Sequence, residues 1–181
     1  EARKKNNNVS WADDLFKSLD VNETEFVGYT EMKADAKVLA LAYDGEFCDV
    51  VSVDEDAKED VLVVLDRTPF YAESGGQAGD EGVIHFNGGE MPVLNTFKLP
   101  NGQHAHVVDS GNVELTTNDV VLLSVDEQYR TDIKKNHSAT HLLNQSLRNV
   151  LGNHVVQQGS QVTYKNLRFD FNHYQNLTDD E

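Results

Sequence analysis

Cysteine, proline and tryptophan are scarce in this chain of 181 residues. It contains one cysteine, three prolines and one tryptophan. A single cysteine, Cys48, excludes a disulfide within the chain and weakly favours a reducing compartment. Cys48 lies in an alternating, strand-like run, so we expect a half-buried structural thiol there.

Long apolar segments are also absent from the sequence. No run of about 18 apolar residues occurs, so we expect no membrane-spanning helix. The chain begins Glu-Ala-Arg-Lys-Lys, without the apolar core of a signal peptide. Its last residues, Thr178-Asp179-Asp180-Glu181, are typical of a helix start, with a threonine cap and acids in the first turn. We therefore expect both ends to be boundaries within a longer protein.

Positive charge is scarce overall but concentrated in one segment. The chain has 15 Lys and Arg against 31 Asp and Glu, and its net charge of −16 argues against a nucleic-acid partner. Residues 130–170, however, hold six basic and two acidic side chains, a net +4 that leaves −20 for the rest. Ordinary surface variation is one explanation, but the positive segment also contains a histidine pair.

Residues 21–129 have the pattern of a β domain. Short runs rich in β-branched and aromatic residues are separated by turn signals at 44–45, 87–89 and 101–102. The regular spacing predicts a closed or nearly closed barrel. The acidic run 54–60 fits a solvated loop. The expected strands are 26–29, 36–41, 47–51, 61–65, 82–86, 104–108 and 120–125.

Helical patterns flank this domain. Residues 1–20 end in an amphipathic piece with Trp11, Leu15 and Phe16 on one face, which we interpret as the remnant of an upstream domain. From residue 131 the period becomes helical until Gly152, a typical C-cap. Strands over 155–164 and 167–171 follow, so residues 130–181 should begin an α+β domain. The helical apolar stripe consists of Thr140, Leu143, Leu147, Val150 and Leu151.

The most informative stretch is His137-Ser138-Ala139-Thr140-His141. Histidines four residues apart lie on one face of a helix, where their ring nitrogens can converge on one metal ion. Zinc sites in enzymes usually take at least three protein ligands, and such a pair can also simply face water. Ser138 stands where a zincin protease requires its general-base glutamate, which disfavours that class.

Two further features are only weak evidence for a ligand site when each is taken by itself. Gly75-Gly76 permits positive φ and close backbone approach to a ligand, although it matches neither the P-loop nor the dinucleotide fingerprint. It can equally be a tight loop between strands. Gln158 offers both a donor and an acceptor, which suits recognition of a small hydroxyl, although glutamine is usually an ordinary surface residue.

Together these motifs resemble the alanyl-tRNA synthetase family over about residues 25–181. The resemblance implies a translation-factor-like β-barrel followed by the start of an α+β editing domain, in a cytoplasmic ligase that attaches alanine to tRNA. ATP and Mg²⁺ would belong to an aminoacylation domain outside this chain. The editing region would hydrolyse tRNA(Ala) mischarged with serine or glycine, with no role for DNA or a membrane. The matching motifs are Pro69 to Gln77, Asn136 to Leu143 and Leu167 to Phe171.

The resemblance also implies a zinc ion. His137 and His141 match two of its ligands, and a Cys-x-x-x-His pair further along the family sequence supplies the others. Cys48 is not expected to be a ligand, because Ser52 stands four residues later. The implied reaction is zinc-assisted ester hydrolysis, with no certain catalytic side chain.

Substrate contacts follow partly from the resemblance and partly from charge. Gln158 matches a position that helps recognise the misattached amino acid, and Gly75 and Gly76 match a glycine motif that helps favour serine over alanine. Thr140 is expected to border the pocket. Candidates for phosphate contacts, on charge and proximity alone, are Lys134, Lys135 and Arg148.

Other interpretations stay open. A free-standing editing hydrolase would share the barrel and the histidine helix, although the helical residues 1–20 favour the synthetase. A non-catalytic tRNA-binding barrel module is the second alternative. Threonyl-tRNA synthetase has a related histidine helix, but the motif of residues 70–77 is not expected there. With half of the zinc ligands, we expect this chain alone to bind zinc weakly or not at all and to deacylate Ser-tRNA poorly.

Overall fold

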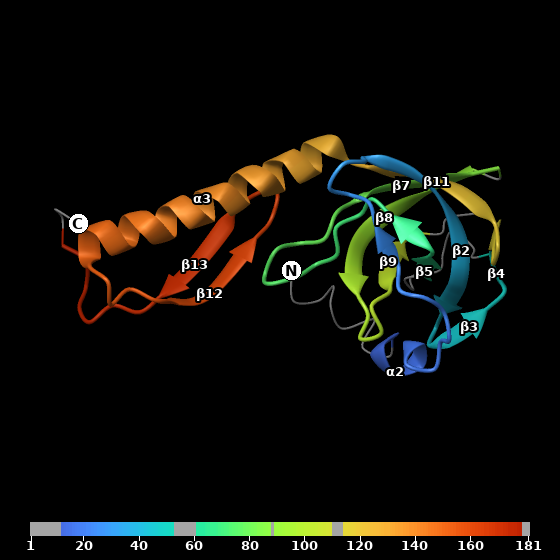
Figure 1. Cartoon of the computed structure of the whole chain (residues 1–181), viewed down its shortest axis with the longest axis horizontal. Helices are drawn as coiled ribbons and strands as arrows, with labels where there is room; N and C mark the ends of the chain where they lie inside the picture. Colours follow the sequence, from blue (N-terminus) through green and yellow to red (C-terminus); the bar gives the residue numbers. More distant parts are fainter. Residues whose placement is uncertain (1–11, 53–60, 88, 110–113, 179–181) are drawn as a thin grey trace. The chain divides into compact units, whose positions relative to one another are not determined.

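The computed structural model describes residues 12–52, 61–87, 89–109 and 114–178 and divides the chain into two compact units (Figure 1). The first unit comprises residues 1–73 and 79–126, and the second comprises residues 74–78 and 127–181. Predictions for Trp11, the acidic run 54–60, Gly88 and residues 179–181 lie outside the described residues.

Each unit has its own set of elements. The helix of the second unit begins at Glu127, close to the expected domain boundary at 129/130. The first unit contains α2 (Ala12–Phe16), β1 (Glu25–Phe26), β2 (Lys33–Tyr43), β3 (Glu46–Cys48), β4 (Val50–Ser52), β5 (Val61–Leu65), β6 (Arg67–Thr68), β7 (Gly82–Phe86), β8 (Gly89–Lys98), β9 (His104–Val108), β10 (Glu114–Thr116) and β11 (Val120–Val125). The second contains α3 (Glu127–Leu151), β12 (Gln157–Val162) and β13 (Leu167–Phe171).

The first unit is built around a closed antiparallel barrel. Its strands follow the order β11-β7-β8-β9-β5-β2, and β11 also pairs with β2, which closes the ring. Strand β3 extends β2, while β10 pairs with β4 and β1 pairs with β6 in two separate ribbons. Closure satisfies both edges of the sheet. The predicted mainly-β fold with a barrel is therefore confirmed.

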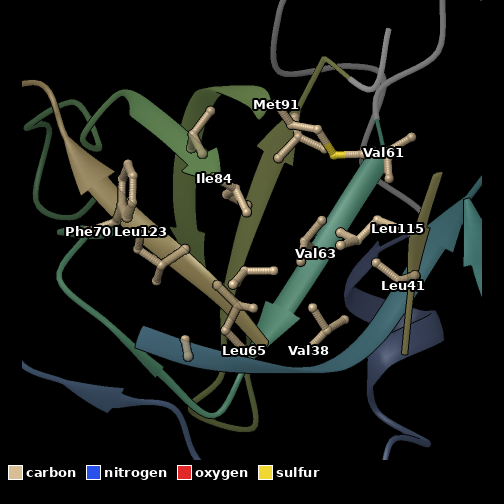
Figure 2. Packing of buried hydrophobic residues seen from close by; sticks show 14 of the residues in the cluster. Val38, Leu41, Val61, Val63, Leu65, Phe70, Ile84, Met91, Leu115 and Leu123 are labelled. Carbon is tan, nitrogen blue, oxygen red and sulfur yellow. The ribbon is translucent and has the colours of Figure 1, made fainter. Parts of the chain in front are cut away.

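Both faces of β5 are covered, which explains why all five of its residues are apolar and buried. Val63 points into the barrel among the side chains of other strands, including Ile84 and Leu123 (Figure 2). Leu62 points to the opposite face and belongs to a second cluster that includes Phe16 of α2. Burying a side chain of this size stabilises the fold by roughly 1.5–3 kcal/mol, so α2 is an integral cover of the barrel.

A β-bulge lets β2 change the face that it buries. Ala36 and Val38 belong to the interior cluster, but beyond the register shift between Val38 and Ala40 it is Leu41 that points inward. Ala40 then joins the outer cluster beside α2. An extra residue at a bulge reverses the alternation of side chains along a strand, so one strand contributes to two cores.

The strands that were predicted best have simple apolar patterns. The expected bounds of 61–65, 82–86, 104–108, 120–125 and 167–171 match β5, β7, β9, β11 and β13. The run 47–51 is broken at Asp49 into β3 and β4, and the expected strand at 26–29 shortens to β1 because a turn follows Phe26.

Strand β8 was missed entirely. Its sequence mixes polar residues with Pro92, and proline cannot donate a ladder hydrogen bond. In the barrel, Pro92 is opposite Val83 and its carbonyl accepts from the Asp109 N–H at 3.0 Å. The turn at 87–89 was the available signal, because a hairpin turn after β7 requires a returning strand.

The helix of the second unit packs differently from the expected stripe. Its buried side chains are Arg130, Ile133 and Thr140, whereas Leu143 and Val150 are 38% and 59% exposed. Leu143 and Val150 of the expected apolar stripe are therefore exposed in the part of the chain that the structure describes. The predicted helix end is confirmed, since Gly152 has φ +114° and donates its N–H to the Arg148 carbonyl.

A buried hydrogen-bond relay lies inside the barrel. His106 Nδ1 donates to the Val63 carbonyl at 3.0 Å, and its Nε2 accepts from the Thr68 hydroxyl at 2.8 Å. Thr68 Oγ1 in turn accepts from the Phe70 N–H at 3.1 Å. Burial is the main reason that the pKa of His106 falls to about 4, outweighing the bond to Val63, and nearby His104 lowers it slightly further. The neutral ring is therefore the folded form.

Acidification should destabilise the barrel through His106. Its folded pKa of about 4 lies below its unfolded value of 6.5, so the unfolded chain binds the proton first as the pH falls. This group should remove about 2 kcal/mol from the free energy of unfolding between pH 8 and pH 5. The free energy of unfolding can be measured at both pH values by urea unfolding followed by near-UV circular dichroism. In His106→Gln, its decrease from pH 8 to pH 5 should be smaller than in wild type by about 2 kcal/mol. Equal pH dependence in wild type and His106→Gln would contradict the assignment.

Candidate functional site

A short loop, residues 74–78, belongs to the second unit although its sequence neighbours belong to the first. Ser74 and Gln77 exchange two backbone hydrogen bonds of 3.2 and 2.9 Å, and the turn between them has φ +58° at Gly75 and +83° at Gly76. These angles favour glycine, because other residues pay a steric cost there. The sequence therefore places the two glycines where the turn needs them.

The loop is fastened to β12 by its backbone. The Val162 N–H donates to the Gly76 carbonyl at 2.8 Å, and the Val162 carbonyl accepts from the Ala78 N–H at 2.9 Å. Gln77 and Val162 form a parallel bridge as a result. A Cβ atom on Gly76 would lie 2.2 Å from the Ser160 carbonyl oxygen, whereas one on Gly75 would meet nothing within 4 Å. Gly76 is therefore a close-approach glycine and Gly75 is not.

The two histidines of the HxxxH motif face each other on α3. Their Nε2 atoms are 2.9 Å apart and their ring centroids 4.9 Å apart, and both residues are exposed. His137 Nδ1 lies 2.5 Å from Gln77 Oε1. An amide oxygen only accepts, so this contact is a hydrogen bond in the tautomer whose hydrogen is on His137 Nδ1, and that tautomer leaves a lone pair on Nε2.

This arrangement fits two corners of a metal site. Two nitrogens bound to one tetrahedral zinc lie about 3.3 Å apart, so the His137 and His141 rings need to separate by only a few tenths of an ångström. Within the described ranges of the chain, no group of three or more His, Cys, Asp or Glu side chains could hold a metal ion. Cys48 is partly buried on β3, where burial and then Asp49 raise the pKa of its thiol.

Thr140 and Asn136 lie four residues apart on α3 and are hydrogen-bonded to each other next to the histidine pair. The Thr140 hydroxyl is buried and donates to the Asn136 carbonyl at 2.8 Å. The Asn136 amide donates in turn to the Thr163 carbonyl at 2.8 Å, at the turn that connects β12 to β13. Asn136 thereby fixes α3 on the hairpin, and the proton of Thr140 is already used within the helix.

Gln158 stands apart from this cluster. Its side chain is exposed and donates to the Val156 carbonyl at 3.5 Å, a local contact. Among the hydrogen bonds between described residues, none joins Gln158 to either histidine of the pair. The glutamine that contacts the pair is Gln77, which belongs to the Pro69 to Gln77 motif but was not among the predicted site residues. Its position directly after the glycine turn was the available signal.

The three basic residues predicted to contact phosphates differ in their surroundings. At 100° per residue, Lys134, His137, His141 and Arg148 fall within about 60° of one another around the helix. Lys134 and Arg148 are exposed and about 21 Å apart along its axis. Lys135 lies on another face, where its ammonium group pairs with Asp132 at 2.9 Å. Only the first two therefore flank the histidines along one exposed stripe.

Comparison with known proteins gives a consistent picture. A family model described as tRNA synthetases class II (A) matches residues 1–129. The alanine–tRNA ligase of Bacillus velezensis is 46% identical over 162 residues, covering 88% of this chain and 18% of that protein. Those of Acetivibrio thermocellus and Halalkalibacterium halodurans are 44% and 41% identical, covering 95% and 99% of this chain. The chain spans about a fifth of the length of these relatives.

The structure contains no helix, among those it describes, that is long and apolar enough to cross a membrane.

Replacing Gly76 by alanine should detach the loop from β12. The added Cβ would collide with the Ser160 carbonyl oxygen, and both backbone hydrogen bonds of Val162 would lengthen. We expect the amide protons of Val162 and Ala78 to exchange with solvent at least tenfold faster, a loss of about 1.4 kcal/mol in local stability.

Gly75→Ala is the matched control, because it suffers a similar positive-φ strain of about 1–2 kcal/mol without the collision. Hydrogen exchange measured on both variants separates the two effects. Equal acceleration in the two variants would mean that contact with Ser160 is unimportant.

Proposed function

We propose that this chain, which belongs to the class II tRNA synthetases (A), forms part of a module that hydrolyses tRNA(Ala) mischarged with serine or glycine. The observation that carries the proposal is the junction of the glycine loop with the histidine pair, made by Gln77 and His137. Two motifs that are 60 residues apart in sequence thus contribute to one site. An active site for alanine rejects glycine and serine poorly, so a second hydrolytic site meets a chemical need.

Four residues of this chain would have distinct roles in the site. His137 and His141 would hold a zinc ion through their Nε2 atoms, with the remaining ligands coming from outside the described residues. When bound, zinc would supply Lewis acidity to the ester carbonyl or to a water molecule. The hydroxyl of Thr140, which lies between the two histidines, is hydrogen-bonded to the Asn136 carbonyl of the same helix. Gly76 lets the loop approach β12 closely.

The stripe of Lys134 and Arg148 would receive the tRNA backbone. Both side chains are exposed on the face of α3 that carries the histidines, and residues 130–170 have a net charge of +4 in a chain of −16. Phosphates attract such cations without reading sequence. A local positive stripe in an acidic protein would direct the 3′ end of tRNA to the histidine pair and away from the rest of the surface.

The histidines can be tested in the complete synthetase that carries this sequence. Changing both His137 and His141 to alanine should lower the hydrolysis of Ser-tRNA(Ala) at least a hundredfold, because two metal ligands are removed. Alanine charging, which would occur in another domain, should stay within about twofold of wild type. Ser146→Ala, a change on another face of α3, serves as the control. Undiminished serine deacylation in the double variant would refute the proposed role of the pair.

Salt dependence distinguishes the basic residues. We expect Lys134→Ala and Arg148→Ala each to reduce the slope of log affinity for tRNA against log salt concentration by about one. Lys135→Ala should leave the slope nearly unchanged, since that ammonium group already pairs with Asp132 on another face. Filter-binding titrations across several salt concentrations give the slopes. A larger effect of Lys135 than of Lys134 would show that the stripe is misplaced.

A further inference from the structure

We propose that Gln77 is a positioning residue that selects the ring tautomer of His137 and fixes the direction in which its Nε2 points. This inference deepens the proposed function, on which its link to a metal rests, and it identifies what the glycine loop contributes to the site. The carrying observation is the contact of Gln77 Oε1 with His137 Nδ1 at 2.5 Å.

The backbone of Gln77 is held on both sides. The preceding carbonyl, of Gly76, and the following N–H, of Ala78, are both bonded to Val162 of β12. Gln77 itself closes the turn through two backbone bonds with Ser74. Little freedom is therefore left in the backbone from which the amide extends, so the entropic cost of aiming its side chain is small. The helix supplies the ring, and the loop supplies an acceptor fixed relative to β12.

The polarity of the hydrogen-bond chain follows from the acceptor. A neutral imidazole carries one hydrogen, on either Nδ1 or Nε2, and an amide oxygen can bond only the Nδ1–H form. That form leaves the His137 Nε2 lone pair directed at His141, whose Nε2 is 2.9 Å away. Without a metal, His141 donates to that lone pair; with one, the same lone pair is a ligand. Metal-bound histidines typically have their second nitrogen held in this way by an oxygen acceptor.

Gln77 could instead serve only to fasten the loop, and the two roles predict different things. A fastening role depends on size and packing, whereas a positioning role depends on the acceptor oxygen. Gln77→Met preserves length and removes the acceptor. Gln77→Glu preserves an acceptor of the same reach. The glutamate variant should therefore restore what the methionine variant loses if the oxygen matters.

The direct test is the tautomer of His137 in the metal-free, ¹⁵N-labelled chain of 181 residues. Long-range ¹H–¹⁵N correlation spectra, recorded above the titration range of histidine, report which ring nitrogen carries the hydrogen. We expect hydrogen on Nδ1 in wild type and in Gln77→Glu, and a shift toward the Nε2–H form in Gln77→Met. Gln161→Met, an exposed change on β12, is the matched control and should resemble wild type.

Two results would overturn the inference: an Nε2–H ring in the wild-type chain, or an unchanged tautomer in Gln77→Met. Amide exchange at Val162 and Ala78 shows whether the loop stays attached in each variant. If the methionine variant releases the loop, the glutamate variant decides, because loss of the Nδ1–H form in an attached loop also refutes the role of the oxygen.

The zinc affinity of the complete synthetase that carries this sequence, measured by competition with a chelator for wild type and for each Gln77 variant, separates this inference from the proposed function. We expect Gln77→Met to weaken zinc binding about 10- to 100-fold, as is usual for loss of an outer-sphere partner, and Gln77→Glu to retain it. An Nδ1–H tautomer in the chain of 181 residues, together with a zinc affinity of the complete synthetase that is unchanged when His137 and His141 are both replaced by alanine, would support the positioning role and count against the metal role of the pair. Zinc binding that is equally strong in wild type and Gln77→Met would refute the positioning role alone.

Discussion

The two backbone hydrogen bonds of Val162 are the interaction on which the candidate site depends. They place a five-residue segment beside β12, so that one edge of a two-stranded hairpin is paired instead of open. The bonds are possible only because Gly76 carries no side chain, since a Cβ would occupy the space of the Ser160 carbonyl. Every property ascribed to Gln77 follows from this attachment, because an amide on a free loop would not select a position for a neighbouring ring.

The two units obtain their stability in different ways. In the barrel, residues of β5 and β9 are buried on both faces, by an interior cluster and by the cluster that includes α2. Among the described residues of the second unit, the buried hydrophobic side chains are Ile133, Val155 and Val162. A two-stranded hairpin has only marginal stability by itself. Polar contacts such as the hydrogen bond from Asn136 to the Thr163 carbonyl therefore contribute a larger share of the stability of the second unit.

Sequence reasoning succeeded where one local rule decided the outcome. Alternating or continuous apolar runs located β5, β7, β9 and β11, and Gly152 marked the end of α3. It failed at β8, where Pro92 obscured a strand that pairs on both sides, and it did not show that Leu143 and Val150 of the apolar stripe are exposed among the described residues. Helical periodicity shows which residues share a face but cannot show what that face meets.

The candidate site was predictable only in part for the same reason. The spacing of His137 and His141 fixes their convergence on one helix, because it is a property of the helix alone. The contact of Gln77 with His137 spans 60 residues and depends on the pairing of the loop with β12, which no local pattern encodes. Similarly, the exposed position of Gln158 reflects the tertiary path of β12 rather than any feature of its own sequence.

The parallel bridge between Gln77 and Val162 has a consequence for how this segment can vary. Successive side chains along an extended segment point to opposite sides, so a shift of one residue turns each side chain away from its former target. Inserting or deleting a single residue between Gly76 and Ala78 would put another side chain in place of Gln77 or aim its amide away from His137. The length of this segment is thus constrained more tightly than its composition, and at Gly75 the backbone angle, not a neighbouring atom, is what opposes a side chain.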